Sequence, residues 1–205
     1  METELKAKSI RVFSQDGLTP LPVPDIFGNT HPVEVDLGCG KGRFLLAHAA
    51  DHPQINYLGI DRMLRRIRRV DRKIVRFGLA NVRLFRMEAY YAVAHLLPAN
   101  SITTYFILFP DPWPKKKHQR HRLFDGPFLE ALYRTLVPGG RVHVATDHLP
   151  YFEAMQASFT ASGRFDRTDT WTPKGHERTD FELLYLDQKE IGRASYTARA
   201  MCPVA

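Results

Sequence analysis

Cysteine and long apolar runs are both scarce in this chain of 205 residues. Its two cysteines, Cys39 and Cys202, exclude a disulfide framework and favour a reducing compartment. The longest apolar run, near residues 102–109, is far too short to cross a bilayer. The first residues lack the cationic and apolar blocks of a secretion signal. We therefore expect a soluble, cytoplasmic protein without membrane contact.

The composition is that of a globular protein, with 44% hydrophobic and 25% charged residues. No internal repeat, low-complexity tract or break in composition divides the chain. We expect one domain over residues 26–205, preceded by a poorly patterned segment at residues 1–25.

The basic character of the chain is concentrated in two short segments. The net charge is +7, from 29 Lys or Arg and 22 Asp or Glu. Residues 62–76 hold eight Lys or Arg and one acid, and residues 115–122 hold five Lys or Arg and no acid. Charge gathered in this way suits a polyanionic partner, above all a nucleic acid. The alternative is that both segments simply face water.

Strand and helix patterns alternate along the sequence. Short apolar runs predict strands at residues 33–37, 55–60, 82–85, 102–109 and 141–146. Helical patterns lie between and after them, at residues 44–50, 63–77, 89–97, 127–136 and 151–161, with Pro138 expected to stop the fourth. Two last β-type stretches, at residues 165–170 and 181–186, predict an antiparallel hairpin at the sheet edge. The predicted fold is therefore α/β, with a mostly parallel sheet and helices on both faces.

A glycine-rich turn follows the first of these strands, at the end of a sheet where ligands bind. It has the pattern G-x-G-x-G over Gly38, Gly40 and Gly42, with Asp36 two residues before the first glycine. This pattern resembles the class I S-adenosylmethionine methyltransferases, which have a Rossmann-like fold and in which the acid faces the ammonium group of the cofactor. A nicotinamide enzyme is the alternative, because Asp61 at the end of the second strand suits the ribose of either cofactor.

A second motif, FPDPWPKKKH at residues 109–118, follows the fourth strand and continues to Arg120, Arg122 and Leu123. Two prolines around an acid and an indole make a stiff loop. The motif resembles the bacterial tRNA (guanine-N7)-methyltransferase family, and the resemblance extends over residues 26–190. The nine histidines do not suggest a metal site, since His118 and His121 lie among Lys and Arg, which repel a cation.

This resemblance implies a reaction and a set of site residues. The reaction is methyl transfer from S-adenosyl-L-methionine to N7 of guanosine 46 in the variable loop of tRNA, with S-adenosyl-L-homocysteine as the product. No obligatory protein partner is implied. The implied cofactor contacts are Asp36, Gly38, Gly40, Asp61, Glu88, Ala89 and Asp111, and Asp111 is also the implied catalytic residue. The implied substrate contacts are Lys115, Asp147, Thr179, Asp180, Phe181 and Glu182.

The chain departs from the family pattern at several positions. Asp36 and Asp61 stand where glutamate is more frequent, and the lysine often found after the Thr-x-Phe-Glu motif is missing. Two further functions therefore stay as alternatives. One is a methyltransferase of the same fold with a different substrate, and the other is a non-catalytic tRNA-binding relative.

Overall fold

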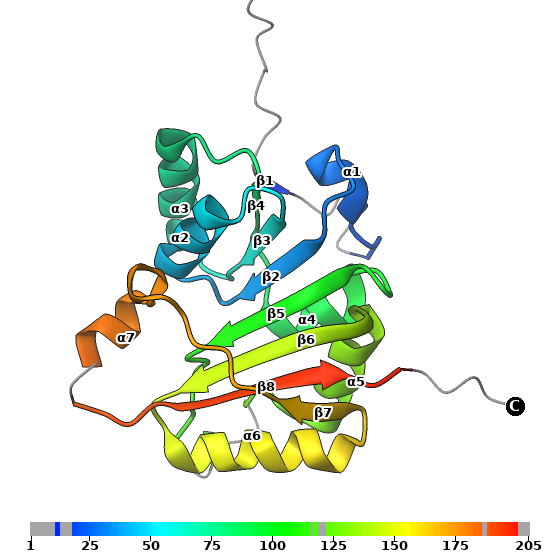
Figure 1. The fold of residues 1–205 in the computed structure, drawn as a ribbon, viewed down its shortest axis with the longest axis vertical. Helices are drawn as coiled ribbons and strands as arrows, with labels where there is room; N and C mark the ends of the chain where they lie inside the picture. Colours follow the sequence, from blue (N-terminus) through cyan, green and yellow to red (C-terminus); the bar gives the residue numbers. More distant parts are fainter. Residues whose placement is uncertain (1–10, 13–17, 116, 119–121, 186–187, 201–205) are drawn as a thin grey trace, which may run out of the picture.

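The computed structural model describes residues 11–12, 18–115, 117–118, 122–185 and 188–200, which form an eight-stranded sheet with helices on both faces (Figure 1). The strands are β1 (Arg11–Val12), β2 (Val33–Leu37), β3 (Asn56–Ile60), β4 (Val82–Phe85), β5 (Ile102–Leu108), β6 (Leu136–Thr146), β7 (Phe165–Thr168) and β8 (Gly192–Ala198). Their order across the sheet is β1-β4-β3-β2-β5-β6-β8-β7.

The pairings confirm a mostly parallel sheet with an antiparallel C-terminal edge. Strands β1 to β6 pair in parallel, whereas β8 is antiparallel to both β6 and β7. One predicted strand is wrong, because residues 181–186 fall largely in helix α7 (Asp180–Tyr185). The Thr179 hydroxyl accepts a hydrogen bond from the Glu182 N–H and so favours a helix start there. The second strand of the edge pair is β8 instead.

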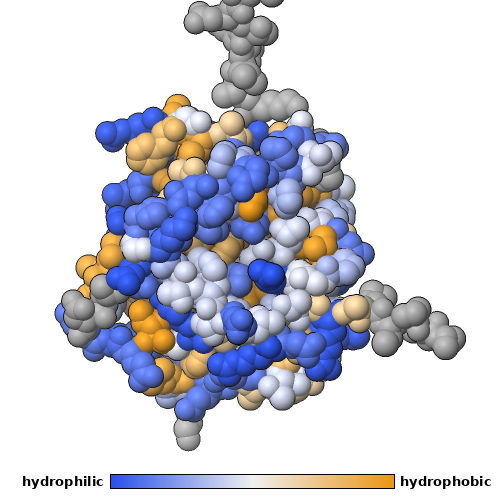
Figure 2. All heavy atoms as spheres, in the orientation of Figure 1, coloured by the Kyte–Doolittle hydropathy of each residue, from blue (hydrophilic) through white to orange (hydrophobic). Residues whose placement is uncertain are grey.

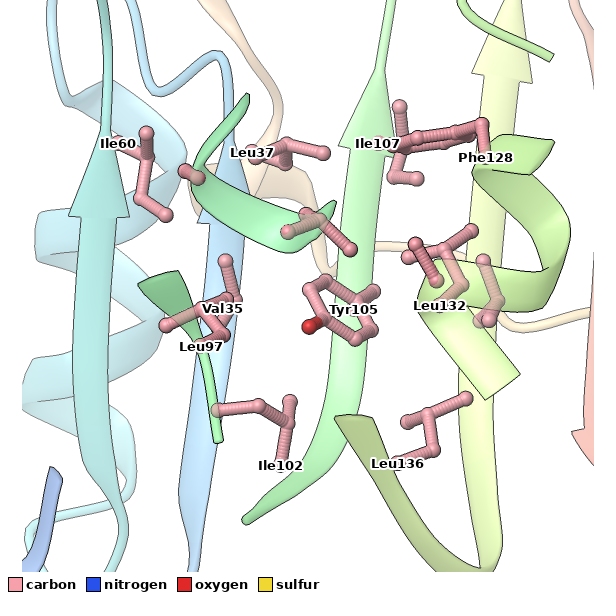
Figure 3. Close-up of a cluster of buried hydrophobic side chains, with 14 of the residues drawn as sticks. Val35, Leu37, Ile60, Leu97, Ile102, Tyr105, Ile107, Phe128, Leu132 and Leu136 are labelled. Carbon is pink, nitrogen blue, oxygen red and sulfur yellow. The ribbon is translucent and has the colours of Figure 1, made fainter. Parts of the chain in front are cut away.

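Helices cover the two faces of the sheet unequally. They are α1 (Val23–Phe27), α2 (Arg43–Asp51), α3 (Leu64–Phe77), α4 (Ala89–Tyr91) with its continuation η1 (Ala92–Leu96), α5 (Gly126–Thr135), α6 (Leu149–Ser162), η3 (Gly175–Glu177) and α7. The larger core lies under α1, η1, α5 and α6 (Figure 3), where Val35, Tyr105 and Phe128 are fully buried. The smaller core lies under α2 and α3.

Segment 1–25 contributes to both the sheet and the larger core. Strand β1 pairs in parallel with β4, and Leu21 and Val23 are buried in the larger core. The hydrophobic pattern of this segment is too weak to show from the sequence that Leu21 and Val23 belong to the core.

Helix α5 and strand β6 meet without a loop. Leu136 ends the helix in an extended conformation and is also the first residue of β6. The Pro138 region lies inside this strand, where the register against β5 shifts, and so the strand begins earlier than predicted. A bulge of this kind accommodates a proline that a regular ladder would exclude.

The order in which successive strands are added to the sheet reverses between the neighbouring parallel strands β2 and β5. From β2 the chain continues to β3 on one side, whereas β5 and β6 lie on the other side. In open parallel sheets, the crevice beyond the carboxyl ends of the strands at such a point is where ligands bind. The glycine-rich turn after β2 and the FPDPW motif after β5 therefore face the same crevice.

Close packing between β3 and α2 gives a stability test at Gly59. A Cβ at this position would lie 2.5 Å from Leu45 Cδ2 and 3.0 Å from Leu84 Cδ2. We expect Gly59→Ala to lower the free energy of unfolding by about 1–3 kcal/mol through overpacking. The matched control is Gly126→Ala, where a Cβ meets nothing within 4 Å. Denaturant unfolding of both variants is the measurement, and equal stabilities would contradict the packing described here.

Candidate active site

Two adjoining cavities lie at the carboxyl ends of β2, β3 and β5. The first cavity, of about 350 Å³, includes Asp61, Glu88 and Ala89 in its lining. The second cavity, of about 440 Å³, includes Asp36, Asp147 and the start of α7. Both volumes are typical of ligand sites. The residues that line both cavities are Gly38, Arg66, Leu108, Phe109, Pro110 and Asp111.

The glycine-rich turn packs against the end of β3 and the side of α3. The N–H groups of Gly38 and Cys39 donate to the Ile60 carbonyl at 2.8 and 3.0 Å. Gly42 has a φ of +74° and lies so close to α3 that a Cβ would come within 2.8 Å of the Val70 methyl groups. A residue with a side chain would be strained there and would collide with α3. The turn thus brings the N-terminus of α2 to the second cavity.

Asp61 connects this turn to α3. Its carboxylate accepts hydrogen bonds from Gly40 N–H at 3.1 Å and from Met63 N–H at 2.7 Å. It also pairs with Arg66 Nη1 at 3.2 Å. The sequence pointed to Asp61 but not to Arg66, five residues later, which lines both cavities. An acid followed by a basic residue in the first turn of the next helix is the signal that was available.

Asp36 is the most deeply buried of the acids that line the two cavities, at 4% exposure. Burial raises the pKa of its carboxyl group to about 7, and the nearby Asp61 carboxylate adds to the rise while His48 opposes it. Among the described residues, no cation forms an ion pair with it. A cationic group placed in the second cavity would therefore stabilise its ionised form.

Glu88 has a structural role as well as a place in the first cavity. Its carboxylate accepts hydrogen bonds from the N–H groups of Tyr90 and Tyr91 at 3.0 and 2.8 Å. It is therefore the N-cap of α4. Ala89, the next residue, also lines the cavity.

The FPDPW loop holds Asp111 between the two cavities by means of strained backbone. Phe109 and Trp113 have φ values of +56° and +43°, which are rare for aromatic residues. The Phe109 N–H donates to the Ala145 carbonyl at 2.7 Å. Strain of this kind persists where surrounding contacts fix the conformation, and it is most frequent at functional sites. Asp111 itself is exposed and lines both cavities.

Arg122 fixes the other end of this loop. Its Nε donates to the Pro112 carbonyl at 3.0 Å, and its guanidinium lies 4.7 Å from the centre of the Tyr151 ring. From the run of basic residues at 115–122 we expected Arg122 to face a polyanion. The guanidinium group of Arg122 faces the protein instead. Lys116, Arg120 and His121 lie outside the described residues.

Helix α7 and the end of β6 complete the second cavity. Thr179, Asp180 and Phe181 line it together with Asp147, and the Phe181 ring packs against Phe109 at 4.9 Å. Glu182 does not line either cavity, since it is buried and pairs with Arg193. Lys115 does not line them either.

Lys189 is a residue that the sequence did not single out. Its ammonium group pairs with Asp147 Oδ2 at 2.5 Å and lies 4.5 Å from the centre of the Tyr185 ring. Because Asp147 lines the second cavity, Lys189 places a cation beside that cavity.

A buried polar cluster holds α7 against the rest of the fold. His48 Nδ1 lies 2.7 Å from Glu177 Oε1, and the Trp171 ring packs against the rings of both His48 and Phe106. Although burial opposes it, hydrogen bonding to Glu34 and Glu177 raises the pKa of His48. The segment that leads to α7 is thus attached to α2, whose N-terminus faces the second cavity.

Comparison with known proteins places this geometry in a family. A family model for putative methyltransferases matches residues 30–184. A tRNA (guanine-N(7)-)-methyltransferase from Streptococcus suis is 36% identical over 173 residues, which cover 82% of this chain and 81% of that protein. One from Enterococcus faecalis is 39% identical over 137 residues, which cover 67% of this chain. The chain spans 64% of the length of the Enterococcus faecalis relative, slightly less than two thirds.

Solved structures with lower sequence identity share the fold. The 16S rRNA methyltransferase KamB matches with a TM-score of 0.65 at 15% identity, over 92% of this chain and 94% of that one. The antibiotic-resistance methyltransferase Kmr matches with a TM-score of 0.61 at 22% identity, over 87% and 92%. These matches confirm the predicted Rossmann-like fold of the class I methyltransferases. In the described part of the chain, no helix has the length and apolarity needed to cross a membrane.

The raised pKa of Asp36 makes stability depend on pH. The folded-state value of about 7 lies above the ordinary 3.8, so between these values the folded protein retains a proton that the unfolded chain has lost. The free energy of unfolding therefore falls as the pH rises through this window, by up to roughly 4 kcal/mol for this shift. Asp36→Asn removes the effect, and so its thermal midpoint should gain on wild type more at about pH 8 than at about pH 5.

The control for this test is Asp25→Asn, at an exposed acid of α1. It should change the midpoint little at either pH. If the Asp36→Asn variant differs from wild type by the same amount at both pH values, the assignment of the raised pKa to Asp36 is wrong.

Proposed function

The chain belongs to the tRNA (guanine-N(7)-)-methyltransferase family, and from this premise we propose that it methylates N7 of guanosine 46 in the variable loop of tRNA. The methyl donor is S-adenosyl-L-methionine, and S-adenosyl-L-homocysteine is the product. The observation that carries the proposal is the place of Asp111, whose exposed side chain lines both cavities at once.

The residues of the two cavities fit S-adenosylmethionine. Asp36 is a buried carboxyl group without a cation partner among the described residues, and it suits the ammonium group of the methionine part. Asp61 has a carboxylate at the end of β3 that can accept hydrogen bonds from the ribose hydroxyls. Gly38 and Ala89 also line the first cavity, and these small residues leave room there for the cofactor. When bound, the cofactor supplies an electrophilic methyl group on a positively charged sulfur.

The proposed reaction needs alignment more than proton transfer. Guanine N7 carries a lone pair and no proton, so the chain needs no general base. Asp111 can accept hydrogen bonds from N1–H and the amino group of guanine and so orient N7 towards the methyl group. Its negative charge also offsets the positive charge that develops on the purine. Phe181 and Phe109 form an aromatic wall of the second cavity, where a base can stack.

The proposal includes tRNA as the macromolecular partner and the cytoplasm as the place of reaction. The charge of the rim supports this partner, since Lys41, Arg43 and Arg66 line the second cavity. These cations lie where the phosphates next to a bound guanosine would approach.

The reaction is tested by incubation with unmodified tRNA and S-adenosylmethionine, followed by chemical cleavage at N7-methylguanosine. We expect one cleavage site, at position 46, in transcripts with guanosine there, and none in transcripts with adenosine there. Methylation of a different atom would contradict the proposal. Cofactor binding without tRNA methylation would favour a methyltransferase of another substrate or a non-catalytic tRNA-binding protein.

Asp111 and Asp36 should affect different steps. Removal of a carboxylate that acts on the developing charge typically lowers turnover by about 10²-fold. We therefore expect Asp111→Ala to lower kcat by about 10²-fold with little change in cofactor affinity. Asp36→Ala should weaken cofactor binding first. Calorimetry gives the cofactor Kd and a radiolabel assay gives kcat, with Asp25→Ala as the control. The reverse order of effects would mean that the two roles are exchanged.

A further inference from the structure

Helix α3 exposes a row of arginines that the catalytic proposal does not use. Ile67, Val70 and Ile74 are the buried residues of this helix and hold it on the sheet. The 3.6-residue period then places five arginines on the opposite side, which we call the outward face. These are Arg65, Arg68, Arg69, Arg72 and Arg76, and all five are exposed.

The charges of the outward face are not balanced by acids. The single acid between residues 62 and 76 is Asp71, and its carboxylate pairs with Arg11 at 3.0 Å. In the described part of the chain, none of the five arginines forms an ion pair. Like charges three or four residues apart destabilise a helix. The arginines of the outward face therefore repel one another. A bound polyanion would offset this repulsion, because its negative charges would attract each of the arginines.

Cations also crowd the side of α3 that is nearest the active site. Lys73 donates to the Lys41 carbonyl at 2.8 Å. Burial lowers the pKa of Lys73, and the charges of Arg69, Arg43 and Lys41 add to this effect although Asp180 opposes it. Because Lys41 and Arg43 line the second cavity, positive charge is continuous from the cavity to the outward face.

The direction of α3 extends this charge away from the cleft. The helix begins beside Asp61, where Arg62 and Arg66 line the first cavity. Its 14 residues span about 20 Å. Figure 1 shows α3 at the outer edge of the molecule, beside α2, and Figure 2 shows hydrophilic and apolar surface side by side in that region. The apolar part includes Val75 and Phe77, which are exposed near the end of the helix.

The residue types on the outward face favour phosphate over bases. Single-stranded RNA is held mainly by aromatic side chains on which bases stack. The one aromatic residue of the helix is its last, Phe77, which is exposed but lies off the outward face by the helical period. The outward face itself therefore offers no ring on which a base could stack. Guanidinium groups in a row instead match the phosphates of a base-paired backbone, a contact that does not depend on sequence.

We propose that the outward face of α3 binds the phosphate backbone of a base-paired stem of the RNA substrate, next to the nucleotide held in the second cavity. The identity of that RNA as tRNA rests on the proposed function. The contact positions the substrate and takes no part in methyl transfer.

The test replaces Arg65, Arg68 and Arg72 together by glutamine and measures RNA binding over a salt series without cofactor. The probes are an unmodified tRNA transcript and an RNA duplex of about 16 base pairs with an unrelated sequence. Each lost phosphate contact lowers the slope of log affinity against log salt by roughly one unit. We expect a slope up to about three units flatter with both probes, and an unchanged kcat at saturating tRNA.

A matched control replaces Arg141, Arg164 and Arg167 by glutamine. These exposed arginines lie on or next to β6 and β7, away from α3, and their removal changes the net charge equally. The control should leave both slopes unchanged. Equal flattening in both variants would reduce the effect to net charge and overturn the proposal. Flattening with tRNA alone would overturn the assignment to a base-paired stem.

The fold and the function are checked separately. Because the replaced charges repel one another, the α3 variant should unfold at the same or a higher temperature than wild type at low salt. A lower midpoint would overturn the claim that these charges are in excess. If wild type forms no N7-methylguanosine but the salt slopes still depend on α3, the proposed function fails and the RNA-binding face stands.

Discussion

The carboxylate of Asp61 is the contact on which the arrangement of the cleft depends. It receives the Gly40 N–H from the glycine-rich turn and the Met63 N–H from the start of α3. One buried side chain therefore fixes the path of the turn and the origin of the arginine-rich helix. The same carboxylate lines the first cavity, so the binding of a ribose there would act on a group that already holds two segments together.

Local patterns in the sequence predicted the elements around this carboxylate well. The glycine-rich turn, the apolar spacing of α3 and its end at Gly78 are properties of short windows, and the fold follows them. One failure lies where long-range contacts decide. Strand β8 has a modest apolar content and forms because β6 and β7 pair with it on both sides. The failure at residues 181–186 has a local cause instead, since this stretch looks β-like but the Thr179 cap favours a helix.

The candidate site, like most of the fold, was predictable from the sequence where local patterns decide and not where distant segments meet. Asp36 near the end of β2, and Asp61 and Asp111 after β3 and β5, could be found because parallel strands bring their carboxyl ends to one edge of the sheet. Partners from distant segments could not be found in this way. The pairing of Arg66 with Asp61 depends on the rotation of α3, and that of Lys189 with Asp147 depends on how the chain returns after α7. Glu182 was included with its neighbours, although helix geometry turns it towards Arg193.

Two opposite arrangements of charge meet at this cleft, and together they suit the proposed binding of both a cation and a polyanion. Acidic side chains line the two cavities, among them Asp36, Asp61 and Asp111, whereas arginines and lysines surround the opening and continue along α3. In the proposed reaction, positive charge moves from sulfur to the purine. Asp111 lines both cavities, so its carboxylate faces the charge before and after the transfer. A fixed carboxylate therefore needs no movement during the reaction, and the strained backbone at Phe109 and Trp113 is a means of keeping it there.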